Sequence, residues 1–228
     1  MEEKVIEDII RHINERFGKE SPLTTSRGKV LEYLGLTLDY STRGKVKISM
    51  CEYVKKLVED APDDMAGVTK TPAGNHLFTT NPECDKFPEK TAQVFHHIVA
   101  KLLYLCKRTR QDIQTAMAFL CTRVKDPDSD DCKKLTCVIQ YLRGTQDTTL
   151  TIEPADHPNW WVDSSYAVHP DMHSHSGMIM MLGKGAMYSC SYKQKLNTKS
   201  ITEAELVGIN DAMGQVLWTC HFLAAQGE

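Results

Sequence analysis

Apolar residues recur at every third or fourth position in six segments of the chain, which is the spacing of one helix face. This pattern predicts helices over residues 4–17, 52–60, 91–107, 112–124, 130–142 and 203–225. Gly18 is expected to end the first helix. The last helix shows one apolar stripe, made of Leu206, Ile209, Met213, Leu217 and Cys220.

Apolar and polar residues alternate elsewhere, which is the spacing of a strand with one buried face. Alternation predicts a hairpin over 34–50 with its turn at 41–44. The alternation resumes at Thr149 with Leu150 and Ile152, and further strands are predicted over 160–163, 177–182 and 186–192. Short turns favour an antiparallel meander for the last strands. The segment 61–90 holds four prolines and two glycines and is expected to be a long irregular connection.

Composition narrows the class of protein. The 228 residues carry 27 basic and 30 acidic side chains, and this net charge of −3 excludes a polycation that coats nucleic acid by charge alone. No run of 18 apolar residues could span a membrane, and the acidic, amphipathic start is unlike a signal or transit peptide. We expect an intracellular protein, cytoplasmic or nuclear.

The eight cysteines contain no C-x-x-C pair, whereas zinc sites usually show two short-spaced ligand pairs. Reduced structural thiols are therefore expected. His169, His173 and His175 share one predicted turn, and without a partner motif this spacing favours a polar turn over a metal site.

Two acidic positions are candidates for chemistry, and each has a plainer interpretation. Asp163 ends the apolar run WWVD, where a buried carboxylate would need a partner or a cation, but strand alternation alone favours a side chain that points to solvent. Glu203 and Glu205 open the last predicted helix. Thr202 followed by Glu205 fits a capping box, and helix N-termini favour acids in any case.

Basic residues cluster in two segments. Residues 101–125 hold six basic side chains against the single acid Asp112, and 184–199 hold four lysines and no acid. Such stretches in a slightly acidic chain could form a surface that follows phosphates, or they could be ordinary solvated faces.

The order of motifs in the C-terminal part resembles the ribonuclease H segment of copia-type LTR retrotransposon Pol polyproteins. That family reads roughly SDADW, a Ser/Thr-Gly pair, a strand ending in Leu-Gly, Ser-x-Lys-Gln, and then SSTEAEY-x-A. The matching residues here are WWVDSSYA at 160–167, Gly177, Leu182-Gly183, Lys193-Gln194 and Thr202-Glu203-Ala204-Glu205.

Upstream motifs resemble the same polyproteins in the region after the polymerase palm. They are YLG at 33–35, Thr71-Pro72, KLLYL at 101–105, TRQDI at 109–113 with glutamine where the family has proline, and YLRGT at 141–145. The resemblance implies two domains, 1–150 from the reverse transcriptase connection region and 151–228 from ribonuclease H. The expected fold is mixed α+β and α/β: a β-hairpin and helical connection region, then a truncated ribonuclease H-like three-stranded meander and helix.

Departures from the family pattern shape the expected activity. The chain has no YxDD motif, so we expect no polymerase activity. By family position Asp163 and Glu205 are the first two ribonuclease H carboxylates and ligands for Mg²⁺. The third would lie on a strand after the long helix, and the chain stops at Glu228. Asp211 lies six residues beyond Glu205, about 600° around the helix, and is a poor substitute.

The leading interpretation is therefore a Pol segment that is inactive as polymerase and as nuclease. A first alternative is a non-catalytic module that binds RNA–DNA hybrid or another nucleic acid through Lys107, Arg108, Arg110, Lys193, Lys195 and Lys199. A second is a residual Mg²⁺-dependent ribonuclease completed in trans by another chain. In either case the strand with Trp160, Trp161 and Val162 is expected to have an unpaired edge, which could support self-association.

Overall fold

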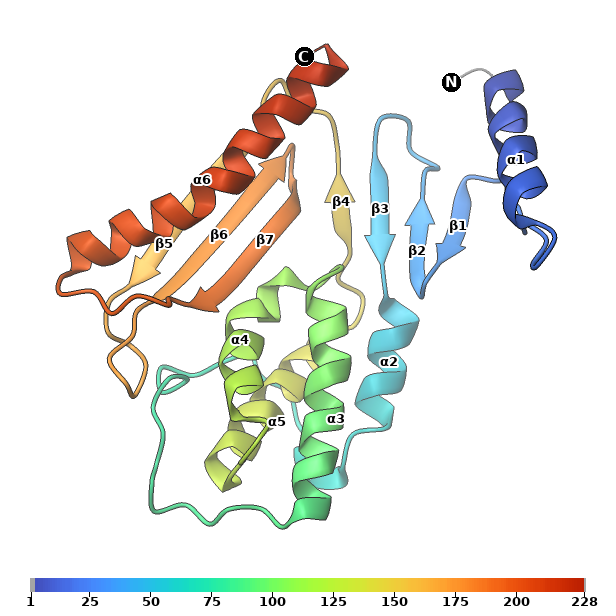
Figure 1. Ribbon diagram of the computed structural model, residues 1–228. Helices are drawn as coiled ribbons and strands as arrows, with labels where there is room; N and C mark the ends of the chain where they lie inside the picture. Colours follow the sequence, from blue (N-terminus) through green and yellow to red (C-terminus); the bar gives the residue numbers. More distant parts are fainter. Residues whose placement is uncertain (1–2, 228) are drawn as a thin grey trace.

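A computed structural model describes residues 3–227 and contains helices and two antiparallel sheets (Figure 1). The helices are α1 (Glu3–Phe17), α2 (Cys51–Glu59), α3 (Glu89–Cys106), α4 (Gln114–Arg123), α5 (Ser129–Gly144) and α6 (Ile201–Gln226). The strands are β1 (Val30–Tyr33), β2 (Leu36–Asp39), β3 (Val46–Ser49), β4 (Leu150–Ile152), β5 (Asn159–Ser165), β6 (His175–Leu182) and β7 (Gly185–Lys193). The mixed helix-and-strand class predicted from the sequence is confirmed.

The first sheet has the order β1-β2-β3-β4. The predicted hairpin is confirmed for β2 and β3, which pair Leu38 with Ile48. Its predicted start at Leu34 is wrong, because Leu34 and Gly35 both have positive φ and form a tight turn back to β1. The YLG motif is therefore a turn between two strands, and β1 extends the sheet by one strand that alternation did not reveal.

Helices α2 to α5 enclose the main apolar core below this sheet (Figure 1). Their inward faces carry the residues predicted from helical spacing, including Phe95, Leu102, Met117, Leu120 and Leu135. Asp128 caps α5 by accepting hydrogen bonds from the backbone of Asp130 and Asp131. The segment 61–90 is irregular as predicted, apart from a short 3-10 helix at Asp63–Met65.

The second sheet has the order β5-β6-β7 and lies between α6 and α4 (Figure 1). Neighbouring residues of β7 show that the two helices cover opposite faces: Tyr192 donates a hydrogen bond to Asp211 of α6, whereas Ser191 bonds Thr115 of α4. This sheet confirms the predicted three-stranded meander. Within residues 3–227 β5 pairs only with β6, so it is an edge strand of this sheet as predicted.

The two sheets meet where β4 lies beside β7. A Cβ on Gly185 would overlap the carbonyl oxygen of Thr151, so this approach requires glycine. Because β4 pairs with β3, residues 150–152 complete the first sheet. The domain boundary expected between 150 and 151 thus falls inside β4.

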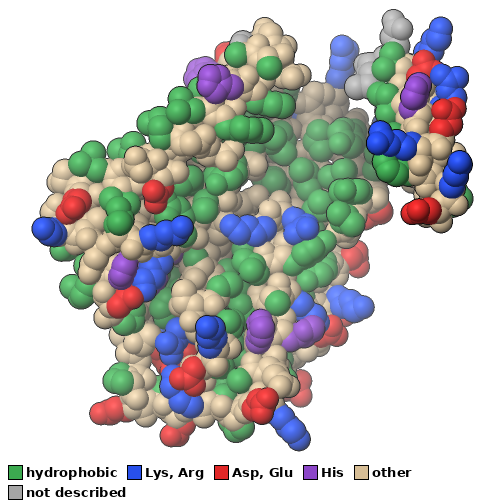
Figure 2. All heavy atoms as spheres, viewed as in Figure 1, with side chains coloured by type: hydrophobic (Ala, Val, Ile, Leu, Met, Phe, Trp, Pro, Cys, Tyr) green, Lys and Arg blue, Asp and Glu red, His purple; other side chains and the backbone are tan. Residues whose placement is uncertain are grey.

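Helix α6 buries its small residues and exposes its large ones. Ala204, Gly208, Ala212 and Thr219 are buried toward the second sheet. The predicted apolar stripe faces outward instead, and Figure 2 shows apolar side chains along the exposed side of this helix. Within residues 3–227, no helix has both the length and the apolar character needed to cross a bilayer.

Candidate functional site

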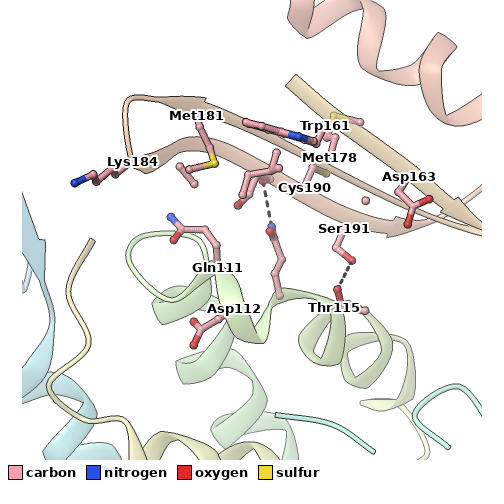
Figure 3. A pocket seen from close by; sticks show the side chains of 15 residues that line it. Gln111, Asp112, Thr115, Trp161, Asp163, Met178, Met181, Lys184, Cys190 and Ser191 are labelled. Carbon is pink, nitrogen blue, oxygen red and sulfur yellow. Dashed lines mark hydrogen bonds between the residues drawn. The ribbon is translucent and has the colours of Figure 1, made fainter. Parts of the chain in front are cut away.

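A groove separates the β5-β6-β7 sheet from the N-terminal end of α4 (Figure 3). One cavity of about 510 Å³ lies between Gln111 and Gln114 on the helix side and Trp161 and Asp163 on the sheet side. A second cavity of about 440 Å³ extends it toward Lys107 and Arg108. The two cavities share four lining residues, Gln111, Ala186, Ser189 and Cys190, and therefore form one continuous groove.

Asp163 stands at one end of this groove. Its partner across the sheet is Gly177, whose own partner on β7 is Ser191. Glycine in the middle of this row leaves open space between the carboxylate and the serine hydroxyl. Asp163 is exposed, as strand alternation favoured, but it is exposed within the groove rather than on a featureless surface.

Ser191 joins the groove to a buried pair of histidines. Its Oγ lies 2.7 Å from Nε2 of His175, and Nδ1 of His175 lies 3.0 Å from Nε2 of His169. Burial lowers the pKa of His175 to about 4 and also lowers the pKa of His169. Both rings pack against Phe78.

The third histidine completes the turn. Nδ1 of His173 lies 2.9 Å from the carbonyl oxygen of Gln194. All three histidines are thus held by protein groups, but the predicted polar turn is wrong for two of them, because His175 opens β6 and both His169 and His175 are buried. Among residues 3–227 no three His, Cys, Asp or Glu side chains lie close enough together to hold a metal ion.

The acidic residues that open α6 have different roles from those predicted. Ser200 is the N-cap, and its Oγ accepts a hydrogen bond from the backbone N–H of Glu203. The carboxylate of Glu203 accepts from the backbone N–H of Lys199 at 2.7 Å. The capping box predicted from Thr202 and Glu205 is therefore wrong by two residues, and capping accounts for Glu203 but not for Glu205.

Glu205 is half-buried on α6, which packs on the strand that carries Asp163. Neither carboxylate forms a hydrogen bond or ion pair within the described chain. Asp211, the remaining acid of the helix, accepts a hydrogen bond from Tyr192 at 3.2 Å. Asp163 faces the groove beside α4, whereas α6 covers the opposite face of the sheet and packs against Val162 and Ser164. The structure therefore does not bring the two predicted Mg²⁺ ligands together, and carboxylates so placed do not fit a site for two ions on one phosphate.

Five of the six predicted basic residues fall into three groups. Lys107 and Arg108 line the groove, with the Arg108 guanidinium 3.6 Å from the ring centre of Tyr104. Lys193, at the end of β7, forms an ion pair with Asp171 and lines a smaller cavity beside His169. Lys195 and Lys199 are exposed in the loop before α6 and line neither cavity of the groove.

Arg110 does not reach the surface. It is 1 % exposed, and its guanidinium binds both carboxylate oxygens of Asp112 and the carbonyl oxygen of Thr145. Tyr141 also donates a hydrogen bond to Asp112 at 2.8 Å. The TRQDI and YLRGT motifs therefore meet in a structural network, and Arg110 is corrected from a ligand-binding residue to a structural one.

Sequence reasoning did not assign three of the groove residues, Trp161, Gln114 and Lys184, to a binding site. Lys184 occupies the Gly-Lys-Gly turn between β6 and β7, within the basic segment that the sequence analysis singled out. Trp161 is half-exposed because it alternates with residues that face α6. Gln114 donates to the carbonyl oxygen of Ser189 and thereby ties α4 to the sheet.

Comparison with known proteins identifies relatives from retrotransposons. A putative transposon Ty5-1 protein of Saccharomyces cerevisiae is 26% identical over 197 residues, which cover 83% of this chain and 62% of that protein. The retrovirus-related Pol polyprotein from transposon TNT 1-94 of Nicotiana tabacum is 24% identical over 82% of this chain and 14% of its own length. The one from transposon RE2 of Arabidopsis thaliana is 30% identical over 62% of this chain and 10% of its own length.

The chain thus spans less than two thirds of the length of these relatives. No protein-family model and no solved structure matches it.

Proposed function

Because this chain is homologous over most of its length to a segment of the Pol polyproteins of Ty5- and copia-type retrotransposons, we propose that it binds an RNA–DNA hybrid without cleaving it. The observation that carries the proposal is the continuous groove between the second sheet and α4.

The charge of the groove supports a phosphate ligand. Lys107 and Arg108 lie at one end and Lys184 lies in the wall, while the carboxylate of Asp112 is neutralised by Arg110. Asp163 is the one remaining acid among the lining residues, so the groove is net positive in a chain that is net negative. Figure 2 shows Lys and Arg side chains across the junction between the second sheet and the helices. Such local positive charge attracts a nucleic-acid backbone.

The apolar lining supports a ligand with sugars and bases rather than a free anion. Trp161, Met178 and Met181 form the sheet side of the groove. Aromatic and apolar side chains contact sugars and bases, whereas charge alone would suffice for phosphate. The hybrid as ligand class comes from the resemblance of residues 160–205 to ribonuclease H segments.

The absence of cleavage is proposed from the acidic residues. A two-metal mechanism needs more than two carboxylates around one phosphate. Asp163 and Glu205 are the two residues in family position, and Asp211 is held by Tyr192. A competing function, residual Mg²⁺-dependent cleavage completed in trans, draws on the edge position of β5, where a strand of another chain could add.

Binding is tested by fluorescence anisotropy of a labelled RNA–DNA hybrid over a series of salt concentrations. Three groove cations predict a slope of log K against log salt of about −3, and the double variant Lys107→Glu, Arg108→Glu should weaken binding at least ~10-fold. Lys90→Glu is the control, because Lys90 is exposed in the first turn of α3, at the opposite end of that helix from Lys107 and Arg108. Equal loss in the control and the double variant would contradict a specific groove.

Cleavage is tested on the same hybrid with Mg²⁺, beside Asp163→Asn. We expect no cleavage by either protein. Cleavage that disappears in Asp163→Asn would replace the proposal with the ribonuclease alternative.

A further inference from the structure

The groove between the second sheet and α4 differs in charge from one end to the other. Figure 3 shows Asp163 and Lys184 at opposite ends of the first cavity, with Trp161 between them. Lys107 and Arg108 line the second cavity, which shares the middle of β7 with the first, whereas Asp163 lines the first cavity alone. The cations therefore lie toward one end of the groove, and a carboxylate without a partner inside residues 3–227 lies at the other.

An open space on the floor of the groove separates Asp163 from Ser191. Gly177 lies between them, paired with one on each side, and a Cβ added to it would meet nothing within 4 Å. Neighbouring strands are about 4.8 Å apart, so the two flanking Cα atoms are roughly 10 Å apart, which leaves room for a sugar ring that hydrogen-bonds on both sides. The Ser191 hydroxyl bonds His175 and Thr115, which leaves one of its acceptor positions for a ligand.

From this arrangement we infer that the groove receives the unpaired 3′ end of an RNA strand. The terminal ribose lies over Gly177, and its 2′ and 3′ hydroxyls donate to the carboxylate of Asp163 and to Oγ of Ser191. The terminal base stacks on Trp161, and the phosphates of the preceding nucleotides lie toward the cations at the other end. The inference rests on the proposed function and specifies which part of the hybrid enters the groove.

The size of the groove favours one strand over a duplex. The first cavity, of about 510 Å³, has the sheet on one side and the start of α4 on the other. Its volume lies within the ~300–1,000 Å³ of pockets that hold one small ligand. A single unpaired strand fits between these walls, whereas two paired strands are too wide. Trp161 is 50% exposed, which leaves part of its ring free to stack on a base.

The position of Asp163 favours a strand that ends in free hydroxyls. A carboxylate repels phosphate, so a strand that continued past Asp163 would place like charges together. A carboxylate only accepts hydrogen bonds, and the two adjacent hydroxyls of a ribose 3′ end can both donate. A DNA 3′ end has one hydroxyl and a phosphorylated end carries a second charge, so both fit this end of the groove less well.

The inference is tested with hybrids that carry a short unpaired RNA 3′ end, measured by fluorescence anisotropy with the label on the DNA strand. EDTA is present, so no metal ion can link Asp163 to a phosphate. The unpaired end with free hydroxyls should bind at least ~10-fold more tightly than a blunt hybrid of the same duplex. It should also bind at least ~10-fold more tightly than the same end carrying a 3′-phosphate.

The role of Asp163 is read from this preference rather than from affinity alone. In Asp163→Asn the preference for free hydroxyls over a 3′-phosphate should fall to less than ~2-fold, because the amide no longer repels phosphate. Asp156→Asn is the control, because Asp156 is exposed in the loop between β4 and β5 and lines neither cavity. It should retain the full preference.

Two further variants test the stacking surface and the open space. Trp161→Leu should weaken binding of the unpaired end by ~10-fold. Trp218→Leu is the matched control, since Trp218 is 58% exposed on α6, which covers the opposite face of the sheet. Gly177→Val should fill the space for the ribose and remove the gain from the unpaired end. Valine favours strands and its Cβ meets nothing there, so thermal unfolding should show an intact fold.

The outcomes separate this inference from the proposed function. A blunt hybrid that binds as tightly as the unpaired end, with loss in Lys107→Glu, Arg108→Glu, would overturn the inference and leave the proposed function standing. No binding of either hybrid would overturn both. A free ribonucleoside 5′-monophosphate that competes as tightly as the unpaired end would also overturn the inference, because the groove would then hold a mononucleotide rather than a strand.

Discussion

The guanidinium of Arg110 binds the carboxylate of Asp112, with Nη2 2.7 Å from Oδ2. The same guanidinium donates to the carbonyl and hydroxyl oxygens of Thr145, and Tyr141 donates to Asp112. Two motifs more than 30 residues apart in the chain, TRQDI and YLRGT, are thereby joined in the interior.

Arg110→Ala is expected to destabilise the fold by about 2 kcal/mol, because it leaves the Asp112 carboxylate and the Thr145 carbonyl without their donor. Urea unfolding followed by circular dichroism measures this loss. Arg110→Lys should recover only part of it, since an ammonium cannot bind both carboxylate oxygens in the same way. Wild-type stability in both variants would contradict the structural role.

The fold should lose stability as the pH falls from about 6.5 toward 4. Burial lowers the pKa of His175 from 6.5 to about 4, so the unfolded chain binds a proton in this range that the folded chain does not. The contribution of His175 is fully present above pH 6.5 and decreases by up to about 3 kcal/mol at pH 4.

Urea midpoints at several pH values test this dependence in wild type, His175→Gln and His97→Gln. His175→Gln should flatten the pH dependence. His97 is exposed on α3, so its variant should retain the wild-type slope. An unchanged slope in His175→Gln would assign the dependence to other groups.

The N-cap of α6 can be identified by two single substitutions. Ser200→Ala should cost about 1 kcal/mol, because the Glu203 backbone N–H loses its acceptor. Thr202→Ala should cost less than about 0.5 kcal/mol, since Thr202 is exposed inside the helix. Thermal or urea unfolding compares the two. A larger loss from Thr202→Ala would restore the capping box predicted from the sequence.

Two glycine-to-alanine substitutions should have opposite effects on stability, one at the contact between β4 and β7 and one at an open position on α6. Gly185→Ala is expected to destabilise by at least about 2 kcal/mol, because its Cβ would meet the backbone of β4. Gly214→Ala should stabilise by about 0.5–1 kcal/mol, since nothing lies within 4 Å of its Cβ and alanine favours the helix. Similar unfolding midpoints for the two variants would argue against close contact between β4 and β7.

Much of the local structure follows from the sequence by itself. The six helices and the strands of the second sheet lie where the periodicity predicts them, because burial of one face imposes its period on each element. The order of the motifs also determined the resemblance to retrotransposon Pol polyproteins, which the relatives bear out. The roles of Asp163 and Glu205 in metal binding and of the basic residues in nucleic-acid binding stay predictions.

Only the tertiary structure decided which surfaces meet. Helical spacing marks an apolar stripe on α6 that includes Leu206 and Met213, but the helix packs through Gly208 and Ala212 instead, because small side chains allow a close approach to the sheet. From the sequence, Arg110 is one cation of a basic segment. In the structure its guanidinium binds Asp112 and Thr145 in the interior. β4 follows α5 in sequence yet pairs with β3, about 100 residues earlier. Each of these outcomes depends on contacts between distant residues, which a local pattern does not contain.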